Sequence, residues 1–279
     1  MLTTPYDMST AALLHPDPIS TRFVSGGGYT DDQVGAECAR LAYVRFETDS
    51  SLWNNLTSFL AQGGFITVTP FEAPAVSTFG FGAFSPVRRT SVVAFRGTQP
   101  ENWENWRTNL SAFLVPWSKG GHVHDGFSAA ALAVSDQVSA WLEAYGAPIS
   151  ESIIFAGHSL GGAVATVLAT LYMPHSLVTI GTPRVGDTDF CDALSGINLR
   201  RYQNCADLVT NVPPRPAYKH ATRPIYIDHT GNVREKAPPK SIRIDKREAR
   251  QTYQPPLDGV PLRDLADHAP INYLRAIIP

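Results

Sequence analysis

The middle of the chain alternates between short apolar runs and longer helical segments, and this alternation limits the possible folds more than any other feature. The apolar runs read SVVAF, SIIFA and SLVTIG. The first segment between them repeats apolar residues at every third or fourth position, and the second is apolar nearly throughout, so both are predicted helices. The predicted strands are 91–95, 152–156 and 176–181, and the predicted helices are 127–145 and 160–173.

A strand–helix–strand order places the strands parallel to one another, joined by right-handed crossovers. Strands that are apolar at every position are covered on both faces. The sequence therefore predicts an α/β fold, in which a doubly wound, mostly parallel sheet has helices on both faces. At 279 residues the chain has the length of one such domain, spanning 1–279.

Further elements are predicted on both sides of this unit. Thr30 and Gln33 have the spacing of a capping box, which predicts a helix from there. A basic stretch at 234–250 is interpreted as a solvated loop face, with a patch facing lipid headgroups as the alternative. The other expected elements are an extended, proline-rich segment at 1–28, a helix within 48–64, and strands at 199–204 and 223–228, the last in a hairpin.

Composition excludes several classes of function. A formal net charge of -2 gives no sequence-wide reason to bind nucleic acid or an anionic membrane. Three widely spaced cysteines make neither a disulfide framework nor a CxxC metal pattern, and the two histidines of GHVHDG lack further ligands nearby, so no metal or cofactor is expected. Without a signal-peptide pattern or a long apolar window, the chain is expected to be soluble, with a cytoplasmic location favoured unless a presequence was removed. No feature indicates an oligomeric state.

The pentapeptide GHSLG at 157–161 indicates that Ser159 is a candidate nucleophile. It fits the pattern G-x-S-x-G, and it lies where a predicted strand passes directly into an apolar helix. This strand–turn–helix arrangement is the one required for a nucleophile elbow, in which a strained turn exposes the serine hydroxyl above the sheet. The helix that follows directs its first N–H groups, that of Leu160 included, at a developing oxyanion.

A serine nucleophile needs a histidine base and a carboxylate, which follow the serine in chain order on such a sheet. Of the histidines after Ser159, His268 is favoured because it lies in a loop just before a terminal helix; the others are His175, His220 and His229. Two aspartates follow predicted strands, Asp187 and Asp207, and the local chemistry favours Asp207 only slightly.

Seven motifs in consistent order resemble the class 3 lipase family, the fungal-type triacylglycerol lipases with the α/β-hydrolase fold. They cover roughly 31–274 and read VVAFRGT, VHDGF, FAGHSLGGA, IGTPRVGD, NCADLVTNVPP, YKH and DHAPINYL. The resemblance implies that Asp207 is the acid, through the family's N-x-x-D-x-V pattern, and that His268 is the base, through its D-H pair. It also implies that Thr98, together with the backbone of Leu160, forms the oxyanion hole.

The segment 99–117 is the candidate lid of the resembling family. Trp103, Trp106, Leu110, Phe113 and Leu114 recur at helical spacing, so a helix here would carry an apolar stripe. Such a stripe would cover the pocket in water and turn outward at a lipid surface, where it would make transient contact. The alternative is an ordinary surface helix.

The predicted function is that of a serine carboxylic ester hydrolase, a lipase that cleaves acylglycerol esters through a Ser159 acyl-enzyme. Because one fold hosts several substrates, phospholipase A1, galactolipase and feruloyl esterase activities are the alternatives within enzymes. A catalytically silent, lipase-like interaction protein is the alternative outside them. The expected partner is a lipid or ester substrate, without nucleic acid.

Overall fold

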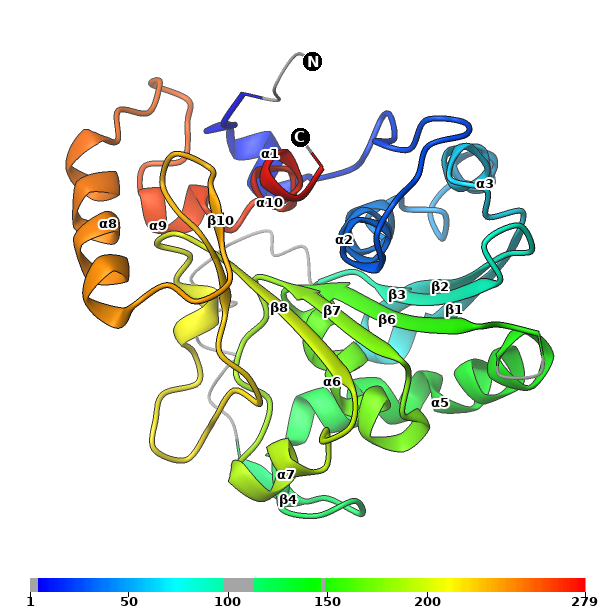
Figure 1. The fold of residues 1–279 in the computed structure, drawn as a ribbon. Helices are drawn as coiled ribbons and strands as arrows, with labels where there is room; N and C mark the ends of the chain where they lie inside the picture. The colour runs from blue at the N-terminus through cyan, green and yellow to red at the C-terminus, as the bar shows by residue number, and fades with distance from the viewer. Residues whose placement is uncertain (1–4, 98–112, 147–148, 279) are drawn as a thin grey trace.

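The computed structural model describes residues 5–97, 113–146 and 149–278, and a twisted sheet runs through the middle of this part (Figure 1). Its eight described strands have the order β1-β2-β3-β6-β7-β8-β9-β10. The run from β3 to β9 is parallel, and β1, β2 and β10 pair antiparallel at the two sides. The strands are β1 (Thr67–Ala73), β2 (Thr78–Ser85), β3 (Thr90–Phe95), β6 (Ser152–His158), β7 (Ser176–Ile180), β8 (Asn198–Asn204), β9 (Ile225–Ile227) and β10 (Val233–Arg234). A separate hairpin pairs β4 (Leu114–Pro116) with β5 (His122–His124).

Helices cover both faces of the sheet. The helix α2 (Asp31–Leu41) packs on β6 and β7 from one side, whereas α5 (Asp125–Tyr145) and α6 (Leu160–Tyr172) pack from the other (Figure 1). The remaining described helices are α1 (Thr10–Leu14), α3 (Ser50–Gln62), α7 (Thr188–Asp192), α8 (Pro239–Thr252), α9 (Arg263–Ala266) and α10 (Pro270–Ile277), with short 3-10 turns at Pro74–Val76 and Val209–Asn211. None of the helices in the described ranges is long and apolar enough to cross a membrane.

The central strand β6 shows why its sequence is apolar at successive positions. Ile154 and Ala156 belong to the core between the sheet and α2, whereas Ile153 and Phe155 belong to the core between the sheet and α5 and α6. Neighbouring side chains of a strand point to opposite faces, so a strand covered on both sides needs an apolar residue at each position. The predicted doubly wound, mostly parallel sheet is therefore confirmed.

The antiparallel pair β1–β2 was not predicted, and glycine and proline explain why. Glycine weakens a strand pattern, yet β2 reads TFGFGAFS because its neighbours leave no room for a side chain. A Cβ on Gly80 would lie 2.3 Å from the carbonyl oxygen of Ala94, and one on Gly82 would lie 2.5 Å from the Trp141 ring. In β1, Pro70 has no N–H to offer, and the strand lies at the edge of the sheet, where proline is tolerated.

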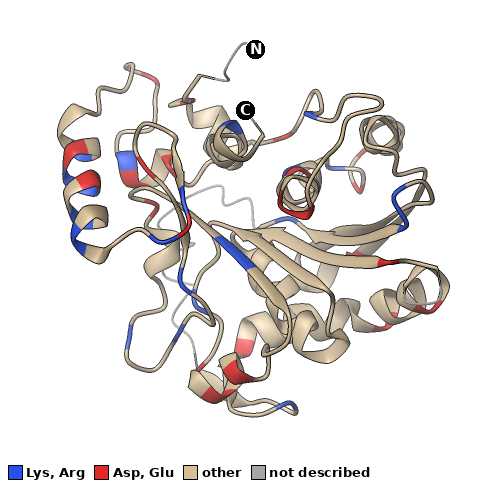
Figure 2. Ribbon diagram, viewed as in Figure 1, with Lys and Arg blue, Asp and Glu red and all other residues tan. Residues whose placement is uncertain are grey.

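Three local expectations were wrong. The extended segment 1–28 contains the helix α1, which Ser9 caps by accepting a bond from the Ala12 N–H. Most of the basic stretch 234–250 is helix α8 rather than a loop, because its Lys, Arg and Glu residues are good helix formers and Pro239 suits a first helical position. Acidic and basic residues alternate along α8 (Figure 2), and Ala249 is its one buried residue, so the predicted solvated face is correct although the loop is not.

The third correction concerns the end of the candidate lid segment. Leu114 does not continue a helical stripe but begins β4, and Trp117 is buried, where its indole N–H donates to the Thr170 hydroxyl at 2.9 Å. Cross-strand pairing with β5 and this buried contact outweigh the helical spacing of the apolar residues. These last residues of 99–117 are therefore anchored to the body of the fold.

Candidate active site

Ser159 occupies the turn between β6 and α6, with φ 56° and ψ -126°. A non-glycine residue at positive φ is strained by roughly 1–3 kcal/mol, and close packing of the strand on the helix maintains it. A Cβ on Gly157 would lie 2.3 Å from the carbonyl carbon of Gly161, and one on Gly161 would lie 2.2 Å from the carbonyl oxygen of Phe95. The predicted strained turn with small neighbours is present.

A row of three buried side chains begins at this serine. The Ser159 hydroxyl lies 2.9 Å from Nε2 of His268, and Nδ1 of His268 lies 2.9 Å from Oδ2 of Asp207. A carboxylate accepts, so Nδ1 carries the hydrogen of this bond, and Nε2 is left to accept the serine proton. Ser159, His268 and Asp207 are 3%, 4% and 0% exposed, respectively, which protects both hydrogen bonds from water.

Sheet topology brings these residues together from distant parts of the sequence. The parallel strands β6, β7 and β8 end at the same edge, where ligand sites of open α/β sheets lie. Ser159 directly follows β6, and Asp207 lies three residues after β8. His268 lies in the connection between α9 and α10.

Two further donors orient the carboxylate of Asp207. The Val209 N–H donates to Oδ1 at 2.8 Å, and the Tyr273 hydroxyl donates to Oδ2 at 2.5 Å. Burial raises the pKa of Tyr273 well above its ordinary value, and the negative charge of Asp207 raises it further. Tyr273 therefore stays protonated and remains a donor to the carboxylate that faces His268.

Comparison with known proteins shows which family the chain resembles. The model of the family "Lipase (class 3)" matches residues 92–217, a range that includes both Ser159 and Asp207. A lipase of Rhizopus niveus is 29% identical over 199 residues, which are 64% of this chain and 49% of that protein. The crystal structure of a lipase from Rhizopus microsporus var. chinensis superposes with a TM-score of 0.55 and 26% identity, over 78% of this chain and 80% of that one. Residues 92–217 of the chain thus resemble the class 3 lipase family.

Other relatives in the family carry more specific names. A "Secreted mono- and diacylglycerol lipase 1" of Fusarium solani is 32% identical over 162 residues, which are 53% of this chain and 48% of the relative. A "Phospholipase A1-II 1" of Oryza sativa subsp. indica is 30% identical over 185 residues, 54% of this chain and 46% of the relative. The chain spans about half the length of these curated relatives.

His158, the second residue of GHSLG, connects two parts of the site. Its Nε2–H donates to the carbonyl of His268 at 2.8 Å, and its Nδ1 accepts from the Tyr43 hydroxyl at 2.7 Å. The Tyr43 oxygen in turn accepts from the Gly97 N–H at 3.1 Å. Burial lowers the pKa of His158 well below its ordinary value, so the ring stays neutral beside His268. Sequence reasoning missed this role.

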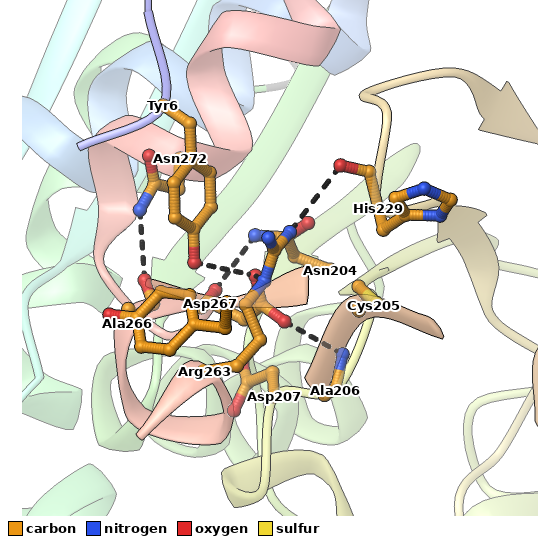
Figure 3. A network of polar contacts seen from close by, with 12 residues as sticks. Tyr6, Asn204, Cys205, Ala206, Asp207, His229, Arg263, Ala266, Asp267 and Asn272 are labelled. Atoms are coloured by element: carbon orange, nitrogen blue, oxygen red, sulfur yellow. Dashed lines mark hydrogen bonds and ion pairs between the residues drawn. The ribbon is translucent and has the colours of Figure 1, made fainter. Parts of the chain in front are cut away.

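Asp267 connects the histidine loop to the aspartate loop and to the start of the chain (Figure 3). Its carboxylate accepts from the Tyr6 hydroxyl at 2.8 Å, from Nε of Arg263 at 2.7 Å and from the Ala206 N–H at 2.9 Å. The side-chain amide of Asn204 donates to its backbone carbonyl at 2.9 Å. Burial raises the pKa of Asp267 to about 6, although the positive charge of Arg263 opposes the increase.

The other histidine and aspartate candidates have structural partners elsewhere. Asp187 caps α7 by accepting from the Phe190 N–H at 2.9 Å, and it also bonds to His122 at 2.9 Å. His175 accepts from the Ile153 N–H, His220 donates to the Thr210 carbonyl, and His229 bonds to Asp245. None of these hydrogen bonds leads to Ser159.

The expected oxyanion hole and lid are only partly within the described residues. Leu160 is the first residue of α6, a position at which the N–H has no acceptor within the helix. Thr98, Trp103, Trp106 and Leu110 lie outside the described residues. Gly97, directly before Thr98, packs so closely on Ser159 that a Cβ there would lie 2.9 Å from the serine Cβ. The Phe113 side chain is 81% exposed.

Proposed function

We propose that this protein is a serine carboxylic ester hydrolase that cleaves acylglycerol esters. The observation that carries the proposal is the buried row Ser159–His268–Asp207, in which both hydrogen bonds measure 2.9 Å. Such a row makes a serine hydroxyl nucleophilic, because the histidine accepts its proton while the carboxylate stabilises the imidazolium that forms.

In the proposed reaction the Ser159 oxygen attacks the ester carbonyl as its proton moves to Nε2 of His268. The N–H of Leu160 and the Thr98 residue stabilise the oxyanion of the tetrahedral intermediate. His268 then returns the proton to the leaving alcohol, which leaves an acyl group on Ser159. A water molecule, deprotonated by His268, attacks this acyl-enzyme and releases the fatty acid.

The substrate class is supported by the names of the relatives. The Rhizopus and Fusarium relatives are named lipases, which favours triacylglycerols, diacylglycerols or monoacylglycerols. The relative of Oryza sativa is named a phospholipase A1, which favours a phospholipid as the second candidate. Galactolipase and feruloyl esterase activities are further alternatives, because one fold accommodates different leaving groups.

The protein is either secreted or cytoplasmic, and the two alternatives can be tested. The Fusarium relative is named as secreted, which does not favour the cytoplasmic location expected from the lack of a signal-peptide pattern. Immunoblots of the medium and of the cell lysate from the source organism distinguish the two alternatives.

The deciding experiment is a substrate panel with a labelling control. Purified protein is assayed on triolein, diolein, phosphatidylcholine, a galactolipid and methyl ferulate, and it is treated with a fluorophosphonate probe. We expect the highest rate on an acylglycerol and labelling that Ser159→Ala abolishes. A folded protein that neither labels nor hydrolyses any ester would instead be a lipase-like interaction protein.

A further inference from the structure

Arg201 is a buried charge without a carboxylate. It lies on β8 and is 8% exposed, and its Nε–H donates to the carbonyl of Thr222 at 3.2 Å. Its Nη1 is fully enclosed and has no hydrogen-bond partner among the residues that the structure describes. Figure 2 shows β8 in blue where the neighbouring strands β6 and β7 are uncharged. Burying an unpaired charge is costly, so this guanidinium needs an explanation.

Two of the three groups that act electrostatically on Arg201 are also basic, and the third is the Tyr273 hydroxyl. Arg184 and Arg215 both act on it as positive charges, and no ion pair within the described residues joins any of these three arginines to an acid. The adjacent Arg200 provides a contrast. Its side chain pairs with Asp32 of α2 through two contacts of 2.8 and 3.0 Å. The two arginines point to opposite faces of the sheet, and only Arg200 has a counter-ion.

A cavity of about 40 Å³ lies beside Arg201. Lys219, His220 and Thr182 contribute polar groups to its wall, and the Thr182 hydroxyl is buried and also has no partner. Leu177 and Leu199 form part of an apolar wall. One water needs about 10–15 Å³, so the cavity of about 40 Å³ has room for about three or four waters or for one small anion.

We propose that this cavity binds one small monovalent anion of carboxylate size, held by the Arg201 guanidinium and the Thr182 hydroxyl. A guanidinium presents parallel N–H groups that match a carboxylate, and the hydroxyl supplies a further donor. The anion would balance a charge that the protein itself leaves unpaired, and the apolar wall would accommodate a short alkyl group.

The ionisation of the lining groups is consistent with this occupant. Burial, with the charges of Arg184 and Arg215, lowers the pKa of Arg201 to about 10, which leaves the guanidinium charged at neutral pH. Burial and the charge of Arg201 lower the pKa of His220 well below its ordinary value. His220 is therefore neutral, so it adds no positive charge beside Arg201.

The test titrates the intact protein with sodium acetate, butyrate or chloride while sodium sulfate keeps the ionic strength constant. Binding to the folded state raises the melting temperature in proportion to ln(1 + [anion]/Kd), by about 3 °C at ten times the dissociation constant. Such an increase with acetate or butyrate supports a carboxylate ligand, and one with chloride alone supports a halide at the same site. No such increase with any of the three overturns the proposal.

Two variants locate the site. Arg201→Gln is expected to abolish this increase, whereas Arg200→Gln, which removes the same charge from the opposite face, retains it. Thr182→Val should weaken binding about five- to tenfold because one hydrogen bond is lost. An equal increase in Arg201→Gln and in the wild type would overturn the assignment. If Arg201→Gln does not fold, wild-type crystals soaked in sodium acetate decide: electron density for a carboxylate beside Nη1 supports the site, and its absence refutes it.

Discussion

At the scale of single residues, two substitutions of Ser159 distinguish the role of its hydroxyl in hydrolysis from the effect of its strained backbone on stability. Ser159→Ala removes the hydroxyl from a turn that accepts a small side chain, so hydrolysis should fall by about 10⁴–10⁶ while the protein remains folded. Ser159→Gly should lose the same activity but gain up to about 1 kcal/mol of stability, because glycine adopts a φ of 56° without strain. Ester hydrolysis and thermal unfolding of both variants test these statements. Residual wild-type turnover in either would exclude Ser159 as the nucleophile.

The two aspartates at the sheet edge make a matched pair of substitutions. Asp207→Asn should reduce turnover by about 10⁴, because an amide at this position no longer holds His268 in the tautomer that accepts the serine proton. Asp187→Asn should retain most of the activity, because Asp187 caps α7 and bonds to His122. The ratio of the two turnover numbers is the measurement. The reverse order would mean that Asp187 is the acid.

The three residues of the buried row at Ser159 were predictable from the sequence, and the residues that surround it were not. Ser159 was identified from the local pattern G-x-S-x-G between a predicted strand and a predicted helix. Asp207 and His268 were identified from their order in the chain and from the motifs that resemble the family. Tyr6 bonds to Asp267 across 261 positions, and Tyr43 bonds to His158 across 115 positions. Local sequence periodicity does not predict such hydrogen bonds, because they depend on which loops lie close together once the sheet has formed.

At the scale of elements, the contact between β6 and α6 depends on the absence of side chains. Gly161→Ala would bring a Cβ to 2.2 Å from the backbone carbonyl of Phe95, which cannot rotate away, so we expect a loss of about 2–3 kcal/mol or more. Gly28→Ala is the control, because no atom lies within 4 Å of its Cβ position. Chemical denaturation of both variants measures the difference. Equal stabilities would mean that the strand and the helix can separate without cost.

The apolar segment 99–117 carries a prediction about lipid surfaces. If it is a lid, activity on a soluble ester series should increase abruptly where the substrate passes its solubility limit, because the stripe then binds the interface instead of the pocket. Trp103→Ser or Trp106→Ser should reduce this increase more than the rate on dissolved ester. A smooth saturation curve, unchanged by both substitutions, would favour an esterase of small substrates. The strand β4 (Leu114–Pro116) is anchored to the body of the fold, so a moving lid would end before Leu114.

Strands that are covered by helices on both faces were predicted, whereas β1, β2 and the exposed helix α8 were not. The apolar run around Ile154 needs only local sequence to identify a strand, because both of its faces are buried. The glycines of β2 weaken a strand pattern in the sequence, and the reason for them, the close contact with Trp141 and Phe95, is visible only in the fold. Pro70 weakens the strand pattern of β1. The helix α8 has a single buried residue, so its pattern resembles that of a solvated loop.

At the scale of the whole molecule, Asp267 should make stability depend on pH. Its pKa is about 6 in the folded protein and 3.8 ordinarily, so the folded state holds the proton more tightly than the unfolded chain. The resulting stabilisation is fully present below about pH 4 and is lost as pH rises through about 6, a change on the order of 3 kcal/mol.

Asn does not titrate, so the free energy of unfolding of the wild type minus that of Asp267→Asn should decrease from about pH 4 to about pH 7. Urea unfolding across this range measures the difference. A constant difference would show that Asp267 stays ionised throughout.

The connection that carries His268 also bears on how the protein is made. A ribosome synthesises β6, the elbow and α6 more than a hundred residues before the loop that supplies the base. A nascent chain that has emerged only this far holds Ser159 as an ordinary alcohol, with no proton acceptor beside it. The hydroxyl gains its hydrogen bond to Nε2 only after the connection between α9 and α10 has been synthesised and α10 packs against α2 and β8. The order of the chain thus separates the synthesis of Ser159 from that of its hydrogen-bond partner by more than a hundred residues.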